Sequence, residues 1–472
     1  MSQDATRSLA EQLDARLAAP GAMDAARFEA FLDAQRRLGL VHGARPLCRH
    51  LRPYLIAEHD LAAIARAAEQ IASALERVAQ RAIWDDFLAE EIGLSADERA
   101  LAAIVPGAGP LHTVGRLDML ITDGGFSFIE YNADSPAGLT DQLLVERTLM
   151  ALPHLAPLRD GHGLRTPAPH RALLGALREG YAAWGGREAR PAIAIVDWAA
   201  VDTSAELRVL ADLFSAEGHR TRIVDPDELT YDGRRLEARG ERIDLVYRRV
   251  ITQELIERRG IDHPLIRAYR DRAAYVANSF RIRPLNKKAA FAVLSNPMFS
   301  GMFSPEQRAA IAEHIPWTRR VTASRAAWRG REVDLVELLL GEQESFVLKP
   351  NDEYGGRGVL LGWTATPAAW REAVRAAADQ PWIAQERRRP RTARMPTFRG
   401  GAVEEEQVYF DLCPFVFARG AEGPLPTFIS RMEGAMVRLS ASEVSNVSAG
   451  GGVTGLVIVD GARAPREGAR DV

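Results

Sequence analysis

Two carboxylates, an amide and an arginine stand close together in the first third of the chain. Arg116 lies two residues before Asp118, and Glu130 lies two residues before Asn132. Side chains two positions apart on a β-strand share one face, so a hairpin turning at 123–125 would bring all four together. Carboxylate and amide oxygens suit Mg²⁺ that carries nucleotide phosphates, and an arginine fork suits a phosphoryl oxygen. The alternative is a solvated strand face with a surface ion pair.

A second group combines a lysine with a glycine-rich turn. An apolar run ends in Lys349, and the glycines Gly355, Gly356 and Gly358 precede the next apolar run. Glycines let backbone N–H groups close over phosphates, and a lysine adds a positive charge. The segment is not a Walker A loop because GxxxxGK[ST] is absent. A plain β-hairpin is the alternative.

Two weaker signals concern a lysine pair and the end of a strand. Lys287 and Lys288 follow Asn286 directly before an apolar helix, where a positive charge is unfavourable for the helix dipole. The pair therefore suggests an anionic partner, although solvent exposure is the better explanation of the pair taken alone. Gln385 and Glu386 end a predicted strand and could form a polar edge for an adenine ring.

Composition limits the class of protein. The 472 residues are 47% hydrophobic and 26% charged with a net charge of −3, which is typical of a globular protein and argues against nucleic acid as the main partner. Two cysteines, Cys48 and Cys413, are too few for a disulfide framework or a zinc site made of cysteines alone. The sequence contains neither a signal-peptide pattern nor a long apolar span, so we expect a cytoplasmic protein without membrane contact.

The elements that must position these residues fall into five segments. Residues 1–105 have helical periodicity, and 106–190 contain the strand pair followed by a helical connection. Residues 191–280 alternate strand, helix and strand, 281–460 carry the lysines and the glycine-rich turn, and 461–472 form a tail. This order predicts a mixed α+β or α/β fold. No GxGxxG follows the first strand at 192–196, so a Rossmann dinucleotide site is not expected.

A further basic pair follows the third strand of this α/β segment. Arg248 and Arg249 could hold a carboxylate of a second substrate. The alternative is an ordinary pair of surface arginines.

Together these groups resemble the circularly permuted branch of the ATP-grasp superfamily, typified by glutathionylspermidine synthase. In that branch the acidic metal-binding segment precedes the two lysine-bearing segments, as it does here. The most specific matches are Glu130–Tyr131–Asn132–Ala133–Asp134–Ser135 and Leu348–Lys349–Pro350, and the resemblance covers about residues 105–460. It implies a permuted ATP-grasp fold with a pre-ATP-grasp-like domain at 191–280 and an added N-terminal helical region.

The resemblance also implies roles for single residues. Asp118, Glu130 and Asn132 would bind Mg²⁺, Arg116 would stabilise the transferring phosphoryl group, and Arg357 would reach the acyl substrate or that phosphate. ATP would be held by residues of the later segments: Lys287 (or Lys288) and Lys349 at the phosphates, Gly355, Gly356 and Gly358 in a flexible lid, and Gln385 and Glu386 near the adenine and ribose.

The activity that this resemblance implies is ATP-dependent carboxylate–amine ligation through an acyl phosphate. The expected substrates are a small carboxylate, such as an amino acid or peptide, and an amine. Helices stand where glutathionylspermidine synthase has a cysteine amidase domain, so we do not expect glutathione and spermidine themselves. Two alternatives remain open: a nucleotide-binding scaffold that has lost turnover, and a kinase that phosphorylates a small molecule.

Overall fold

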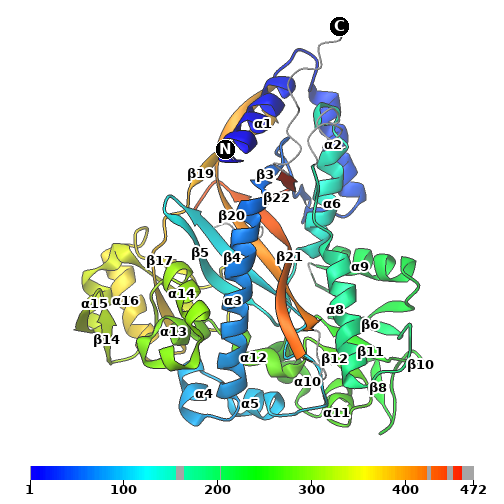
Figure 1. Ribbon diagram of the computed structural model, residues 1–472, viewed down its shortest axis with the longest axis vertical. Coiled ribbons are helices and arrows are strands. Elements are labelled where there is room, and N and C mark those ends of the chain that lie inside the picture. The colour runs from blue at the N-terminus through cyan, green and yellow to red at the C-terminus, as the bar shows by residue number, and fades with distance from the viewer. Residues whose placement is uncertain (1, 156–163, 202, 422–426, 444–449, 460–472) are drawn as a thin grey trace.

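The computed structural model describes residues 2–155, 164–201, 203–421, 427–443 and 450–459; the tail expected at 461–472 lies outside these ranges. A long antiparallel sheet occupies the centre, flanked by a parallel α/β unit on one side and a smaller antiparallel sheet on the other (Figure 1). Within the described ranges, no helix is long and apolar enough to cross a membrane. The mixed α/β class predicted from the sequence is confirmed.

The central sheet joins strands from both ends of the sequence. Its order is β22, β21, β20, β4 and β5, with β19 paired to β20. The strand pair expected around the turn at 123–125 is β4 and β5. β20 pairs with β4, so the C-terminal strands complete the sheet that carries the predicted acidic face. The bounds are β4 (Val114–Thr122), β5 (Gly125–Asn132), β19 (Thr392–Arg399), β20 (Ala402–Ala421), β21 (Thr427–Ser440) and β22 (Gly452–Thr454).

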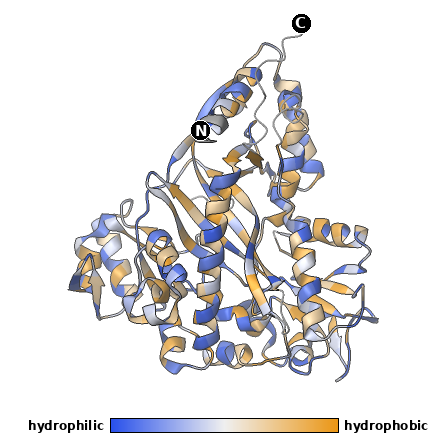
Figure 2. Ribbon diagram, viewed as in Figure 1, coloured by the Kyte–Doolittle hydropathy of each residue, from blue (hydrophilic) through white to orange (hydrophobic). Residues whose placement is uncertain are grey.

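One face of this sheet packs against the long helix α3 (Glu58–Ala82), which crosses it in Figure 1. The helical spacing of apolar residues puts Ile64, Ile71 and Leu75 on the sheet side, where they are buried with Leu117 of β4. Full burial of such a side chain stabilises the fold by about 1.5–3 kcal/mol. The apolar face of β4 and β5 is therefore fixed in the core. Helix α3 carries both hydrophobic and hydrophilic residues (Figure 2), as expected of a helix with one buried face.

The segment 1–105 is mostly helical, as expected, but it also contains three short strands. β3 pairs in parallel with β23, a pairing with the C-terminal part of the chain that local periodicity does not reveal. The elements of this region and their partner are α1 (Ser2–Leu17), α2 (Ala25–Arg37), α4 (Asp86–Ile92), α5 (Ala96–Ala102), β1 (Val41–His42), β2 (Arg45–Pro46), β3 (Tyr54–Ala57) and β23 (Leu456–Val459).

The α/β unit is a parallel sheet in the order β12, β11, β6 and β7. The three strands expected from the sequence are β6, β7 and β11, and the polar stretch between β7 and β11 forms a small antiparallel sheet of β8, β9 and β10. Helices α6 and α8 connect the central sheet to this unit. The bounds are α6 (Leu139–Met150), α8 (Pro169–Trp184), β6 (Ile193–Val196), α9 (Ser204–Ala216), β7 (Thr221–Val224), β8 (Leu229–Tyr231), β9 (Leu236–Ala238), β10 (Glu241–Arg242), β11 (Leu245–Arg248), α10 (Thr252–Arg259), α11 (Pro264–Arg270) and β12 (Tyr275–Ala277).

The third unit, called the lysine lobe below, is an antiparallel sheet in the order β13, β18, β16 and β17, with helices α15 and α16. Two helices of this part of the chain begin at capping side chains, because Ser304 and Thr366 each accept a hydrogen bond from a backbone N–H of the helix that follows. The bounds are α12 (Arg283–Asn286), α13 (Ala289–Ser295), α14 (Pro305–His314), β13 (Thr318–Arg320), β14 (Arg325–Trp328), β15 (Arg331–Asp334), α15 (Leu335–Gly341), β16 (Phe346–Pro350), β17 (Leu360–Leu361), α16 (Pro367–Ala378) and β18 (Trp382–Glu386).

Candidate functional site

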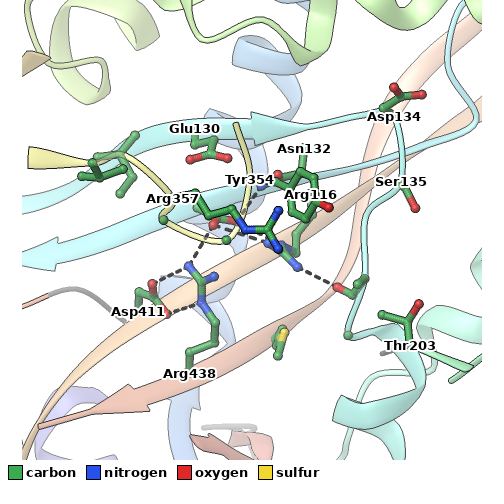
Figure 3. A pocket seen from close by; sticks show the side chains of 18 of the residues that line it. Arg116, Glu130, Asn132, Asp134, Ser135, Thr203, Tyr354, Arg357, Asp411 and Arg438 are labelled. Atoms are coloured by element: carbon green, nitrogen blue, oxygen red, sulfur yellow. Dashed lines mark hydrogen bonds and ion pairs between the residues drawn. The ribbon is translucent and has the colours of Figure 1, made fainter. Parts of the chain in front are cut away.

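A cavity of about 590 Å³ lies where the central sheet, the α/β unit and the lysine lobe meet. Figure 3 shows part of its lining, with side chains that come from β4, β5, β20, β21 and the glycine-rich loop. Most residues singled out in the sequence line it: Arg116, Asp118, Glu130, Asn132, Lys349, Gly355, Gly356, Arg357, Gln385 and Glu386. Lys287, Lys288 and Gly358 are close to this lining but are not part of it.

The polar face of β4 and β5 has the geometry expected from the sequence. Arg116 is paired with Asn132 and Asp118 with Glu130 across the two strands. The Arg116 Nε donates to Asp118 Oδ1 at 2.9 Å, and Asn132 Nδ2 donates to the same oxygen at 3.2 Å. Leu117 and Tyr131 point to the opposite, buried face. The predicted convergence of the four side chains is therefore confirmed.

Two residues that the sequence analysis missed complete this face. Arg438 of β21 donates from Nη2 to Asp118 Oδ2 at 2.8 Å and from Nε to Asp411 Oδ1 of β20 at 3.0 Å (Figure 3). Asp411 is the one charged residue in the apolar run 408–417. Because a buried charge needs a partner of opposite charge, a single carboxylate in such a strand indicates that a buried cation lies beside it.

Asp118 is consequently saturated with hydrogen bonds. Its Oδ1 accepts from Arg116 and Asn132, and its Oδ2 accepts from Arg438 and, at 3.4 Å, from Arg116 Nη2. Four donors use the lone pairs that a carboxylate offers in its plane. Burial alone would raise the pKa of Asp118, but the two arginines hold it well below its ordinary value. The carboxylate is thus ionised and holds both guanidinium groups in place.

Lys349 ends β16 at the floor of the cavity. Its Nζ donates to Gln385 Oε1 at 2.8 Å and to the Ile129 carbonyl at 3.3 Å. Burial lowers the pKa of Lys349 to about 8, an effect that the nearby Glu130 carboxylate opposes. The next residue on β18, Glu386, forms ion pairs with Arg329 and Arg388 at 3.3 Å each. The lysine and the strand end predicted to act together are therefore neighbours.

The adjacent lysines Lys287 and Lys288 point to different partners. Lys287 Nζ lies 2.9 Å from Glu98 Oε2 and also bonds to Asp352, inside a buried ionic network. Lys288 Nζ lies 3.5 Å from Glu130 Oε1, next to the acidic face of the cavity. Of the two, Lys288 is the lysine whose charge is directed at the predicted metal and phosphate residues.

The glycine-rich loop between β16 and β17 requires its glycines. Gly355, Gly356 and Gly358 have φ angles of +65°, +74° and +70°, a conformation that side chains other than glycine rarely adopt. A Cβ on Gly358 would also lie 2.7 Å from Pro350 Cγ. Arg357, between the glycines, places its guanidinium 5.0 Å from the centre of the Tyr354 ring. The loop therefore brings a cation and an aromatic ring to the cavity.

The α/β unit supplies the remaining wall of the cavity. Arg249 is buried, bonds to the Pro136 carbonyl and lies 3.5 Å from Glu206 Oε2. Arg248 is also buried and pairs with Asp134 at 2.6 Å, so the interpretation of this pair as ordinary surface arginines is wrong. Arg248 ends β11, the inner strand between β6 and β12, and Arg249 follows it directly. A role for them in binding a second carboxylate stays a prediction.

Acidic side chains also line this wall. Burial raises the pKa of Asp141 to about 7 and that of Asp197 to about 6. Among the described residues, no group of three or more histidine, cysteine, aspartate or glutamate side chains is arranged to hold a metal ion. The predicted Mg²⁺ ligands are two carboxylates and an amide, a set that also relies on phosphate oxygens.

Comparison with curated proteins finds two distant relatives that are named as ligases. No family model matches the sequence. A candidate glutamate–cysteine ligase 2-2 of Frankia casuarinae is 27% identical over 442 residues, and a candidate glutamate–cysteine ligase 2-3 of Frankia alni is 26% identical over 440 residues. Each alignment covers 87% of this chain but 46% of the relative, so the chain spans about half the length of the curated relatives it matches.

A solved structure shows the same fold over nearly the whole chain. The glutathione synthetase-like effector of Globodera pallida superposes with a TM-score of 0.60, covering 92% of this chain and 96% of its own, at 15% identity. The chain therefore shares the fold of this glutathione synthetase-like protein. The permuted order of its segments stays a prediction.

Proposed function

We propose that this protein is an ATP-dependent carboxylate–amine ligase of the permuted ATP-grasp type. The observation that carries the proposal is one cavity that joins Lys349, the glycine-rich loop and the Arg116–Glu130–Asn132 face. These groups can hold a nucleoside triphosphate and neutralise the charge of a transferring phosphoryl group. The names of the Frankia relatives, which mention glutamate and cysteine, support amino acids as first substrates to test.

The nucleotide would lie between the lysine lobe and the central sheet. Lys349 and Lys288 would contact the phosphates, with the glycine-rich loop above them. Gln385 and Glu386 on β18 would face the adenosine part, next to Trp363, over whose ring the Arg387 guanidinium lies at 3.9 Å. Lys287 would act through the loop, because its partner Asp352 stands at the start of that loop.

Glu130 and Asn132 are the residues best placed to hold Mg²⁺. Glu130 is partly exposed to the cavity, and Asn132 uses its nitrogen for Asp118, which leaves its carbonyl oxygen as an acceptor. Asp118 would join them as a ligand after releasing one of its four donors. Bound Mg²⁺ would supply positive charge to the phosphate oxygens.

The chemistry then needs no nucleophilic side chain. The substrate carboxylate attacks the γ-phosphorus of ATP, and the bond to the β-phosphate oxygen breaks, which gives an acyl phosphate and ADP. The amine, as the free base, attacks the acyl carbon and displaces phosphate to form the amide. Arg116 and Arg438 lie side by side on Asp118 and would stabilise the oxygens of the transferring group.

The test is to incubate the protein with Mg-ATP and pairs of amino acids, beginning with glutamate and cysteine, and to measure ADP and amide by mass spectrometry. We expect ADP release that depends on the acid, amide that depends on both substrates, and loss of both in Glu130→Ala. Glu332→Ala is the matched control, because Glu332 pairs with the exposed Arg325 on the β14–β15 hairpin. A stable phosphorylated acid would indicate a kinase instead, and an absence of nucleotide binding would indicate a scaffold.

A further inference from the structure

The glycine-rich loop contacts the α/β unit across the cavity. Tyr354, one residue before the glycines, donates from its hydroxyl to Glu254 Oε1 at 3.2 Å. Glu254 belongs to α10, one hundred residues earlier in the chain, and both side chains line the cavity. Tyr354, Arg357 and Arg116 line the same cavity and are drawn together in Figure 3, so this contact holds the loop at the cavity that contains the face proposed to handle the phosphoryl group.

The α/β unit holds Glu254 in position for this contact. Its second oxygen, Oε2, accepts a hydrogen bond from Trp198 Nε1 at 3.1 Å and lies 3.7 Å from the Arg258 guanidinium. That guanidinium lies 4.7 Å from the centre of the Trp198 ring. Two side chains of this unit, Trp198 and Arg258, thus hold the carboxylate through Oε2, and Oε1 is the oxygen that accepts the hydrogen bond from the tyrosine.

The loop side of the contact is rich in glycine. The backbone of Gly355, Gly356 and Gly358 can change conformation at little steric cost, and Tyr354 is 44% exposed. Arg357 rests against the Tyr354 ring at 5.0 Å, so displacement of the tyrosine would also displace this cation from the cavity. The position of Arg357 therefore depends on where the tyrosine hydroxyl is held.

We propose that Tyr354 and Glu254 are positioning residues that latch the glycine-rich loop onto α10 and close the cavity over the reacting phosphate. The consequence for catalysis rests on the proposed function: a latched loop excludes water from the phosphoryl group and from the acyl phosphate. An unlatched loop would let water take the place of the amine.

Trypsin offers a direct measure of loop opening, because Arg357 is an exposed cleavage site within the loop. The rate of cleavage of the Arg357–Gly358 bond is followed by mass spectrometry in the wild type, Tyr354→Phe, Glu254→Ala and the double variant. Tyr231→Phe is the matched control, since it removes a tyrosine–carboxylate bond of 2.9 Å, to Asp271, that lies outside the cavity. Thermal midpoints report whether each variant is folded.

We expect each single variant to cleave about three- to tenfold faster than the wild type, the range that corresponds to the net loss of one ordinary hydrogen bond. The double variant should cleave no faster than the faster single variant, because both changes remove the same bond. Tyr231→Phe should cleave at the wild-type rate. Wild-type cleavage in both single variants, or additive effects in the double variant, would overturn the latch.

The same assay separates the latch from the proposed function. With Mg-ATP present, cleavage at Arg357 should slow in the wild type. The rate at which water hydrolyses ATP to ADP should rise severalfold in both single variants, at an unchanged thermal midpoint. A merely structural effect would lower the midpoint without raising this hydrolysis. If nucleotide protects no form while the variants still cleave faster, the latch stands and the proposed function fails.

Discussion

The pKa of Lys349 leads to a pH dependence of nucleotide binding that can be calculated in advance. Burial lowers this pKa to about 8, so the ammonium is about nine-tenths charged at pH 7 and about one-tenth charged at pH 9. If the charged lysine binds the phosphates, the Kd for Mg-ATP should rise about tenfold between these two pH values. Below pH 7 the Kd should change little through this group, because the lysine is already charged.

Isothermal titration of Mg-ATP at several pH values between 7 and 9 measures this effect. Lys349→Arg is the informative variant, since a guanidinium stays charged throughout this range and its binding curve should be flat with pH. Lys349→Met should bind Mg-ATP weakly at every pH, and its Kd should not change with pH through this position. Other titrating groups act equally in all three proteins, so the difference between wild type and the arginine variant isolates Lys349.

Two results would refute this reasoning. A wild-type Kd that changes less than twofold between pH 7 and 9 would show that the lysine does not lose its proton in this range, or that its charge does not act on the phosphates. A tenfold loss that persists in Lys349→Arg would assign the pH dependence to another group.

Two further predictions concern buried charges outside the phosphate contact. Burial raises the pKa of Glu146 to about 8 from an ordinary 4.5; the folded protein therefore holds a proton that the unfolded chain releases, and stability falls as pH rises between these values. Oε1 of Glu146 accepts both hydrogen bonds of this carboxyl group, while Oε2 is unpartnered. Glu146→Gln should therefore stabilise the protein by up to about 3 kcal/mol at pH 7 and by less than about 1 kcal/mol at pH 5. Equal thermal midpoints for variant and wild type at pH 7 would contradict this. Lys287→Met should destabilise the fold by about 3 kcal/mol and so lower the thermal midpoint strongly, because it leaves the buried Glu98 with one partner fewer. Lys288→Met should chiefly weaken Mg-ATP binding, because Lys288 faces Glu130. The reverse pattern would return the phosphate role to Lys287.

The part of the site that could be predicted from sequence is the part made by neighbouring residues. Alternation along two adjacent strands fixes which side chains share a face, so Arg116, Asp118, Glu130 and Asn132 meet as expected. Arg438 could not be assigned to this face, because it arrives through strand pairings between 114–122 and 402–440 that no local pattern encodes. Its role was visible only once the order of strands in the sheet was known.

Orientation within short segments was the other limit. Lys287 and Lys288 occupy the break between α12 and α13, where successive side chains follow no regular period, so the sequence could not tell which lysine faces the cavity. The burial of Arg248 and Arg249 was missed for a different reason. Whether a residue at a strand end is buried depends on the elements that cover the sheet, and these come from distant parts of the chain.

The measurement that tests the central claim most directly is the thermal stability of wild type and Glu130→Ala with and without Mg-ATP. At a ligand concentration 100 times the Kd, binding stabilises the native state by about 2.7 kcal/mol, which is readily visible as a higher midpoint. We predict that the wild type shifts with ATP only when Mg²⁺ is present and that Glu130→Ala does not shift. No shift in either protein, or an equal shift in both, would contradict the proposed nucleotide and metal site.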